Sequence, residues 1–533
     1  MSKIIELGEK GRNQLIKGID TLADSVVCTL GPNGRNVVIS KPGEVVKSTK
    51  DGVTVAKNID LKDPVEETGV QLVKQAAIKT ADKAGDGTTT STLLAREMIK
   101  LGLSSLNEGE NAVEIKRDID KAVKQVVESL RSNLSEDISS ENQLEQIATI
   151  SANNDPEVGK LIATAIDKVG RDGVVHIEES KSGETYLETV EGMQFDRGYK
   201  SHFFVTDNNS MSCTLKDAYI LVADHKFTQV KELLPILEGV SNTNKSLVII
   251  AEDIDNEALA TLIVNKARGT LKICAIKAPD FGDRRKLILE DIATLTGGQV
   301  FDKDKGMKLD KFSWDWFGEA RAITVTKDKT TIVDGKGDEE KINQRVEELQ
   351  SQVDNSNTPF EIEQLQNRLS KMVGGVSIIH VGGYNETEMN EKKDRVDDAL
   401  NATQAALSEG IVPGGGSALL YARNSIDNCS IGSDIVYKAC GKPFAQILEN
   451  AGFDNTQVGK LVDKLINSGN DGWAGYNLKT DKIVDMKESG IIDPAKVTRT
   501  ALENAASVAG TVLLTECVVV EETQEGAQPN MMF

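Results

Sequence analysis

The chain has 533 residues, which is too long for a single hydrophobic core and predicts two to four domains. Hydrophobic residues make up 39% and charged residues 27% of it, as in soluble globular proteins. The net charge of −21 disfavours a nucleic-acid partner, because binding to the phosphate backbone needs a basic surface.

The N-terminal part is predicted to be mainly helical as far as about residue 133. Asp63 is the expected N-cap of the second helix, and Pro64 occupies its first helical position. The expected helices are 7–30, 63–83 and 112–134, the first of them followed by a GPNG turn, and the expected short strands are NVVIS (36–40) and VTVA (53–56).

The middle of the chain alternates between strand-like and helical stretches, which is an α/β pattern. Residues 338–371 are expected to form a helical hairpin that turns at NSNTP, and the pattern is helical again from about residue 385 to 517. The two ends are therefore predicted to form one discontinuous domain around an inserted α/β middle. The expected elements of the middle are the strands GVVHIEES, YLETVEGMQF, AYILVAD, SLVIIAED, LKICAIKAP, AITVTKD and GVSIIHVGG, and helices at 229–239 and 256–268.

Three glycine-rich stretches are candidates for a binding site: TLGPNGRN (29–36), AGDGTTT (84–90) and VPGGGSA (412–418). Each is expected to expose backbone N–H groups at the start of a helix, where phosphate binds, although each alone also fits a tight turn. The chain has no GxxxxGK[ST] motif and no GxGxxG motif after a strand. A P-loop ATPase and a Rossmann enzyme are therefore disfavoured.

Asp86 lies between two glycines and directly before three threonines. This arrangement suits a hard cation such as Mg²⁺, which is usually held by one or two carboxylates together with phosphate oxygens. Asp51 lies beside another glycine, and Asp398 lies in an expected helix. Taken alone, Asp51 and Asp398 are also consistent with a helix cap or a solvated charge.

Six cysteines are scattered along the chain without a CxxC pair, which predicts buried, reduced thiols. The first residues, MSKIIELGEKGR, are too charged for a signal peptide. No apolar run approaches the roughly 20 residues of a membrane span. Together these features predict a cytoplasmic location.

Long motifs follow one another along most of the chain: TLGPNGRNV, STKDGVTVA, AGDGTTT, ISANND, EGMQFDRGY, IAEDIDNEALATLIVN, KAPDFGDRRK, DIATLTGG, EKKDRVDDALNAT, PGGGSALL and SGIIDPAKVTRTALENAASVAG. In this order, from the first helix to about residue 520, they resemble the group I chaperonins, the bacterial GroEL type. The resemblance implies an α/β multidomain chaperonin fold, homo-oligomeric rings, usually of seven subunits, and a GroES-type co-chaperonin as a partner. The implied domains are a mostly helical equatorial ATP-binding domain (1–133 and 407–533), an intermediate domain (134–189 and 376–406) and an α/β apical polypeptide-binding domain (190–375).

The resemblance also implies ATP, Mg²⁺ and K⁺ as ligands. Asp86 would bind Mg²⁺, and Asp398, with Asp51 beside it, would activate the attacking water once the intermediate domain closes. Lys50 would lie near the phosphates and the monovalent cation. The other implied nucleotide contacts are Thr29, Leu30, Gly31, Pro32, Gly87, Thr88, Thr89, Thr90, Gly415, the base-lining Asn477, Leu478 and Lys479, and the ribose-binding Asp493.

For non-native polypeptides, the resemblance implies an exposed apolar surface on the apical domain. Leu259, Ile263 and Val264 share one helical stripe, so their spacing alone fits core positions equally well. The resemblance favours a binding surface made by Tyr199, Phe203, Phe204, Leu234, Leu237, Leu259, Ile263 and Val264.

Several features depart from the family pattern. The C-terminal EETQEGAQPNMMF lacks Gly-Gly-Met repeats. Trp314, Trp316 and Phe317 occupy positions that are usually more polar, which indicates either a better-packed apical core or an altered contact. Lys200 and His202 replace residues that are usually apolar or proline.

The residues expected to form contacts between rings also differ from the family pattern. Ala445 replaces an arginine, Glu108 replaces a small residue, and Asp454 stands for the family's carboxylate. Loss of the arginine and gain of an acid predict loosely paired or single rings. The sequence thus predicts an ATP-driven chaperonin, the alternative being a non-hydrolysing holdase or structural ring protein.

Overall fold

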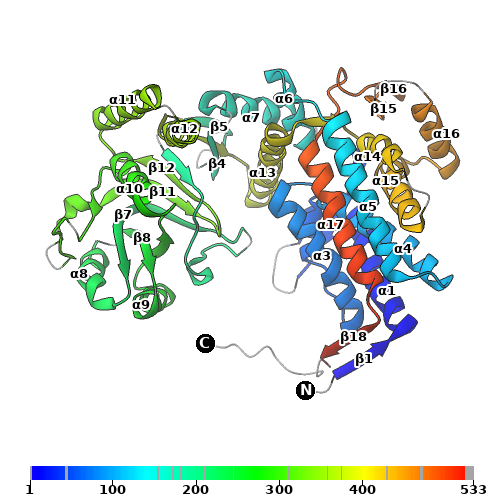
Figure 1. Ribbon diagram of the computed structural model, residues 1–533, viewed down its shortest axis with the longest axis horizontal. Helices are drawn as coiled ribbons and strands as arrows, with labels where there is room; N and C mark the ends of the chain where they lie inside the picture. The colour runs from blue at the N-terminus through cyan, green and yellow to red at the C-terminus, as the bar shows by residue number, and fades with distance from the viewer. Residues whose placement is uncertain are drawn as a thin grey trace. The chain divides into compact units, whose positions relative to one another are not determined.

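The computed structural model describes residues 3–41, 46–152, 155–170, 173–180, 183–190, 192–208, 210–243, 245–303, 305–309, 312–356, 358–373, 375–427, 430–467 and 472–521. The chain forms two compact units (Figure 1). Unit 1 comprises Met1–Ala163, Lys181–Gly183 and Gly382–Phe533, and unit 2 comprises Thr164–Ser180 and Glu184–Val381. Both chain ends thus belong to unit 1, and the finer three-domain division stays a prediction.

Unit 1 is mostly helical, and α1, α3, α4, α5 and α17 pack together around its main core. Its strands form four short antiparallel pairs. The helices are α1 (Gly8–Val27), α2 (Gly52–Lys57), α3 (Pro64–Ala84), α4 (Thr88–Asn107), α5 (Ala112–Ser129), the π-helix η1 (Leu130–Leu134), α6 (Glu141–Ser151), α13 (Glu386–Glu409), α14 (Ser417–Ala422), the 3₁₀ helix η5 (Arg423–Ser425), α15 (Ile431–Asn450), α16 (Asn455–Ile466) and α17 (Ala495–Leu513). The strand pairs are β1 (Lys3–Leu7) with β18 (Cys517–Glu521), β2 (Val37–Ile39) with β3 (Lys47–Thr49), β14 (Ile411–Pro413) with β17 (Ile492–Pro494), and β15 (Ala474–Asn477) with β16 (Lys482–Asp485).

The start of α3 confirms the local prediction, because the Asp63 side chain accepts hydrogen bonds from the backbone N–H groups of Val65 and Glu66. The prediction of a strand at VTVA is wrong, because this stretch belongs to α2. Its β-branched residues favour a strand, but the Asp51 side chain caps the helix and Val55 is buried in the core. The stretch 29–36 is also not at a helix start, because it follows the end of α1.

Unit 2 is built on a seven-stranded sheet with the strand order β6-β12-β11-β7-β8-β9, in which β10 also pairs with β7. Strands β7, β8 and β9 are parallel, and a separate three-stranded sheet has the order β4-β13-β5. The strands are β4 (Val174–Glu179), β5 (Tyr186–Val190), β6 (Gly192–Phe195), β7 (Cys213–Phe227), β8 (Ser246–Ile254), β9 (Ile273–Lys277), β10 (Val300–Phe301), β11 (Gly318–Val325), β12 (Thr330–Gly335) and β13 (Val376–Val381).

Helices cover both ends of this sheet, and Figure 1 shows α8 and α9 at the end opposite to α11 and α12. Helices α11 and α12 form the expected hairpin, and α7 crosses from unit 1 into unit 2. The helices are α7 (Pro156–Val169), η2 (His202–Phe204), α8 (Val230–Ser241), α9 (Asn256–Ala267), α10 (Gly282–Thr296), η4 (Trp314–Trp316), α11 (Glu339–Asn355) and α12 (Pro359–Val373). None of the helices described above is long and apolar enough to cross a lipid bilayer.

The aromatic residues near β11 mainly extend the core of unit 2. Phe317 is buried, Trp316 packs against the core, and Trp314 stays partly exposed. Gly239 in α8 makes room for them, because a Cβ atom there would lie 3.2 Å from Phe312 and 3.3 Å from Trp314. This arrangement supports the better-packed core for Phe317 and Trp316. The C-terminal tail lies outside the described residues.

The cysteines follow the expectation only in part. Cys213, Cys274 and Cys440 are buried free thiols, whereas Cys28 is half-buried and Cys517 is exposed. The prediction of burial is therefore wrong for Cys517, which lies on the two-stranded ribbon β1–β18. Cys429 lies outside the described residues.

Candidate functional site

Unit 1 contains a cavity of about 630 Å³ between segments that are far apart in the sequence. Of the seventeen nucleotide-site residues predicted from the sequence, Thr88 alone is absent from its lining. The predicted residues that line the cavity are Thr29, Leu30, Gly31, Pro32, Lys50, Asp51, Asp86, Gly87, Thr89, Thr90, Asp398, Gly415, Asn477, Leu478, Lys479 and Asp493.

The loop that carries Asp86 needs both of its glycines. Gly85 and Gly87 have φ angles of 75° and 88°, in the left-handed region that favours glycine. A Cβ atom at Gly85 would lie 2.1 Å from Cβ of Asn401, and one at Gly87 would lie 2.8 Å from Val497. The close packing around both glycines therefore leaves no room for a side chain on either side of Asp86. The Asp86 carboxylate accepts a hydrogen bond from the Gly87 backbone N–H.

Helix α4 begins directly after this loop, and no side chain caps its N-terminus. The first N–H groups of a helix lack intrahelical partners, so they can bind an anion that enters the cavity. Thr88 is buried, and its hydroxyl is one of the buried polar groups without a hydrogen-bond partner among the described residues. Thr89 lies so close to α2 that a Cβ atom at Gly52 would be 2.3 Å from its Oγ1 atom.

Asp51 has two roles in the structure, because it caps α2 and also lines the cavity. Its two carboxylate oxygens accept hydrogen bonds from the N–H groups of Val53 (3.0 Å) and Thr54 (2.7 Å). The helix cap and the site position, which sequence reasoning treated as alternatives, are therefore both present. The cap holds the Asp51 carboxylate in one orientation toward the cavity.

Carboxylates dominate the electrostatics of the cavity. Burial, followed by the charges of Asp86 and Asp51, raises the pKa of Asp398 well above its usual value. Burial also raises the pKa of Asp86, and it raises the pKa of Asp493 to about 7. Because each negative charge disfavours the others, the arrangement favours a bound cation.

The donor set fits Mg²⁺ held together with a ligand. The described part of the chain contains no group of three His, Cys, Asp or Glu side chains placed to hold a metal ion. A cation beside Asp86 would therefore need oxygens from elsewhere, as Mg²⁺ obtains from nucleotide phosphates. The free N–H groups at the start of α4 and the hydroxyls of Thr89 and Thr90 suit those phosphates.

Asp398 already lines the cavity in this structure. It lies on α13, which packs against α6 and α17 within unit 1. The family resemblance implies that a domain movement brings this residue to the site. In this structure α13 lies beside the cavity, and the Asp398 carboxylate interacts with those of Asp86 and Asp51.

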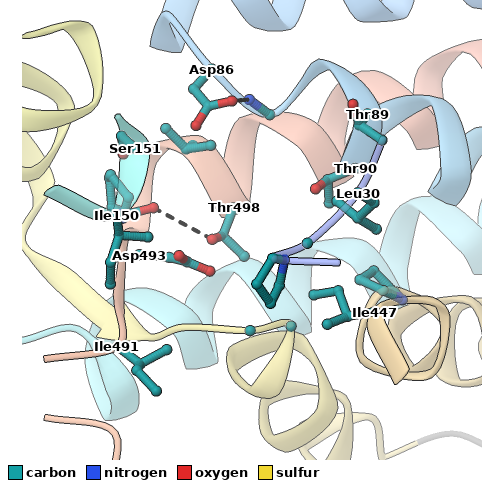
Figure 2. A pocket seen from close by; sticks show the side chains of 18 of the residues that line it. Leu30, Asp86, Thr89, Thr90, Ile150, Ser151, Ile447, Ile491, Asp493 and Thr498 are labelled. Atoms are coloured by element: carbon teal, nitrogen blue, oxygen red, sulfur yellow. Dashed lines mark hydrogen bonds between the residues drawn. The ribbon is translucent and has the colours of Figure 1, made fainter. Parts of the chain in front are cut away.

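Figure 2 shows Asp86 and Thr89 toward one end of the cavity in this view, with Ile447 and Ile491 toward the other and Asp493 between them. Several further lining residues, among them Ile150, Ser151, Ile447 and Ile491, were not predicted from the sequence. Ile150 and Ser151 belong to the motif ISANND, so the family motif could have identified them. Nothing local marks Ile447, because its place depends on how α15 packs.

The predicted polypeptide-binding residues lie in unit 2, away from this cavity in the sequence. Phe203, Leu234 and Val264 are exposed, and Tyr199, Leu259 and Ile263 are half-buried against the core. The expectation of exposure is wrong for Phe204 and Leu237, which are buried. Leu237 lies on the buried face of α8 with Leu233, Ile236 and Val240.

Lys200 and His202, which depart from the family pattern on this surface, both contact neighbouring side chains. Lys200 is paired with Asp253 and Asp255, so it is not a free charge beside the exposed residues. The ring of His202 packs on that of Phe203, with their centroids 4.1 Å apart.

Residues 22–523 match the model of the TCP-1/cpn60 chaperonin family. The structure is similar to that of the chaperonin gp146 from the bacteriophage EL 2 (Pseudomonas aeruginosa), crystallised in the presence of ATP-BeFx. One crystal form gives a TM-score of 0.70 at 22% identity, covering 98% of this chain and 100% of that chain. A second crystal form gives 0.64 at 22% identity, covering 97% and 99%. The expected multidomain α/β chaperonin fold is thereby confirmed.

Proposed function

The chain belongs to the TCP-1/cpn60 chaperonin family, and from this premise we propose that it is an ATP-hydrolysing chaperonin of the group I, GroEL type. Unit 1 would bind and hydrolyse Mg-ATP, and unit 2 would capture non-native polypeptides. Homo-oligomeric rings, usually of seven subunits, would then enclose the captured chains for folding.

One observation carries the proposal: Asp86 with the start of α4, Asp398 and Asp493 meet in one cavity although they are far apart in the sequence. The phosphates would bind at the start of α4, with Lys50 and a K⁺ ion near them, and Asp493 would accept hydrogen bonds from the ribose hydroxyls. The base would lie near Asn477, Leu478 and Lys479. The ATP-BeFx present with the phage chaperonin supports a nucleotide ligand for this fold.

The carboxylates divide the work of hydrolysis. A bound Mg²⁺ would neutralise phosphate charge, and Asp86 would hold it. Asp398 would orient and deprotonate the attacking water, because burial and neighbouring charge make its carboxylate a stronger base than usual. Asp51, fixed by its cap hydrogen bonds, would lie beside Asp398 and help to position the water.

The test is the ATPase rate of the wild type against Asp398→Ala. We expect nucleotide binding to remain and hydrolysis to fall by about 10²–10⁴-fold, as for other general bases. Asp397→Ala is the matched control, since Asp397 is the neighbouring acid on α13 but does not line the cavity. Equal rates in wild type and Asp398→Ala would refute the mechanism, and absent hydrolysis in the wild type would favour a holdase or structural ring.

Exposed apolar residues support polypeptide capture and self-assembly. Phe203, Leu234 and Val264 offer unit 2 an apolar surface for unfolded chains. In unit 1, the ribbon β1–β18 exposes Ile5 and Val519 directly opposite each other, which suits a contact with another subunit.

Ring pairing is proposed to be weak, and a GroES-type co-chaperonin optional. Glu108 ends α4, and Asp454 is committed to capping α16, where it accepts a hydrogen bond from the Gln457 N–H. Native mass measurement with and without ATP tests this part: a stable double ring without nucleotide would contradict it. Refolding that strictly requires an added lid would contradict an optional co-chaperonin. A cytoplasmic location stays a prediction.

A further inference from the structure

Unit 2 contains two buried free thiols in one core, Cys213 at the start of β7 and Cys274 in β9. Strand β8 lies between β7 and β9 in the sheet, so the two residues are not on neighbouring strands. The nucleotide site and the proposed polypeptide surface use neither thiol.

One segment, residues 199–206, forms backbone hydrogen bonds to the sheet near both cysteines. On one side, the Tyr199 backbone N–H donates to the Thr326 carbonyl at 3.1 Å. The residue before Thr326 is Val325, which pairs with Cys213 across β11 and β7. Cys213 therefore lies directly beside the place where Tyr199 joins the sheet.

The next residue of the same segment, Lys200, forms a hydrogen bond to β9. The Lys200 backbone N–H donates to the Ala275 carbonyl at 2.8 Å, and Ala275 follows Cys274. Two consecutive residues of the segment thus bond to Thr326, directly after the β11 residue that pairs with Cys213, and to Ala275, directly after Cys274 in β9. These backbone hydrogen bonds place the two cysteine residues near the same short stretch of chain.

The two side chains interact there. A hydrogen bond from Cys274 lowers the pKa of the Cys213 thiol, and burial, followed by the same hydrogen bond, raises the pKa of Cys274 well above its usual value. The Lys266 ammonium lowers the pKa of both thiols, and it donates hydrogen bonds to the carbonyls of Phe203 (2.6 Å) and Val205 (2.7 Å). Cys213 is thereby the more readily ionised thiol, and the thiolate is the form that reacts.

We propose that Cys213 and Cys274 are a redox-sensitive pair, which a small peroxide converts into an intramolecular disulfide beneath residues 199–206. The Cys213 thiolate attacks the peroxide, breaking its O–O bond and forming a sulfenic acid and hydroxide. The Cys274 sulfur then attacks the sulfenic sulfur and displaces its oxygen as water. In balance, two thiols and one peroxide give one disulfide and two waters. Two equivalents of an external thiol then reduce this disulfide to the two cysteines and are themselves oxidised to a disulfide.

The consequence for polypeptide capture rests on the proposed function. The segment 199–206 carries Phe203, whose side chain is 58% exposed. A disulfide beneath the segment would hold it more rigidly, so we expect capture of an unfolded, cysteine-free polypeptide to change at least severalfold on oxidation and to return with a dithiol reductant.

The chemical test does not depend on capture. A protein carrying Cys28→Ala, Cys429→Ala and Cys517→Ala keeps Cys213, Cys274 and the buried Cys440 as its remaining thiols. It is treated with hydrogen peroxide to constant mass, then denatured, alkylated and digested. We expect a loss of two hydrogen atoms, a peptide linking Cys213 to Cys274, and alkylation of Cys440 alone.

Adding Cys274→Ala to that protein should abolish the link and leave a sulfenic acid at position 213 that a dimedone reagent traps. The proposal is overturned if all three thiols are alkylated after oxidation, if the link involves Cys440, or if Cys213 and Cys274 oxidise without joining. Formation of the link without any change in capture would refute the functional consequence and leave the redox pair standing.

Discussion

Asp398 and Asp86 face one cavity, and the charge of Asp86 is the first electrostatic cause, after burial, of the raised pKa of Asp398. Two neighbouring carboxylates that repel each other are unfavourable unless a cation or a proton lies between them. The empty site is therefore destabilised at neutral pH, and a magnesium nucleotide would relieve this repulsion on binding.

The carboxyl group of Asp493, in the same cavity, makes the stability of the folded chain depend on pH. The pKa of Asp493 is about 7 in the folded protein, against 3.8 in a model peptide. Between these values the folded chain keeps a proton that the unfolded chain has released, so the free energy of unfolding falls as the pH rises from about 4 to 7, by up to roughly 4 kcal/mol. Urea unfolding of the nucleotide-free protein at several pH values measures this slope.

In Asp493→Asn the Asp493 contribution to that slope should disappear, and the protein should be more stable than the wild type near pH 7. Asp463→Asn, at an exposed position of α16, should retain the wild-type slope. Identical pH profiles for the wild type and Asp493→Asn would show that burial of this carboxyl does not control the stability of unit 1.

Gly85→Ala should damage the phosphate loop. The left-handed φ of 75° costs a non-glycine residue about 1–2 kcal/mol, and the 2.1 Å approach to Asn401 adds a steric cost. We expect a loss of at least about 2 kcal/mol in unfolding free energy and severalfold weaker nucleotide binding, measured by urea unfolding and calorimetry. Gly459→Ala, in α16, meets nothing within 4 Å and should instead stabilise by about 0.5–1 kcal/mol.

Sequence reasoning succeeded where a feature depends on neighbouring residues. The start of α3 follows from Asp63 and Pro64, whose chemistry acts within one helical turn. VTVA was assigned wrongly because propensity favours a strand, whereas the Asp51 cap and burial of Val55 decide for a helix. Asp51 directly before this stretch is itself a local signal for a helix start, but the prediction gave more weight to the β-branched residues.

The sequence did not predict which side chains are exposed and which line the cavity, because both depend on long-range packing. Leu234 and Leu237 lie three positions apart on α8, and only the packed structure shows that one is exposed and the other buried. Ile447 lines the cavity because α15 packs beside it, a relationship that no motif around Ile447 encodes. The residue pattern itself marked the stretch around Asp86 as a phosphate site, whereas the role of Asp398 came from the family resemblance, since the meeting of the two is a long-range property of the fold.

Substitutions at Leu234 and Leu237 should distinguish a loss of polypeptide binding from a loss of stability. Leu234 is 40% exposed and Leu237 is 5% exposed. Leu234→Ser should reduce the capture of an unfolded polypeptide severalfold, with a stability change within about 0.5 kcal/mol. Leu237→Ser should cost about 2–5 kcal/mol, as for other large buried apolar side chains. Capture that is unaffected by Leu234→Ser would remove this position from the proposed surface.

Asp291 anchors the helical hairpin α11–α12 on α10. Its buried carboxylate accepts hydrogen bonds from Arg345 Nε at 2.9 Å and from Arg368 Nε and Nη2 at 2.8 and 2.9 Å. Asp291→Ala leaves two arginines without their shared partner, so we expect a loss of about 3–5 kcal/mol in unfolding free energy. Glu348→Gln breaks only an exposed ion pair with Arg345 and should change stability by about 1 kcal/mol or less. Equal effects of the two changes would contradict the anchoring role.

Ring assembly can be tested at the ribbon β1–β18. Ile5 and Val519 lie opposite each other on its two strands and are 59% and 53% exposed, an apolar pair that a neighbouring subunit would bury. Ile5→Lys should place a charge in that contact, so native mass spectrometry should show single subunits in place of rings. Val113→Lys, at an exposed position in the first turn of α5, should leave the rings intact. Rings that survive Ile5→Lys would show that this ribbon does not join subunits, and dissociation by both changes would reflect added charge and not the ribbon contact.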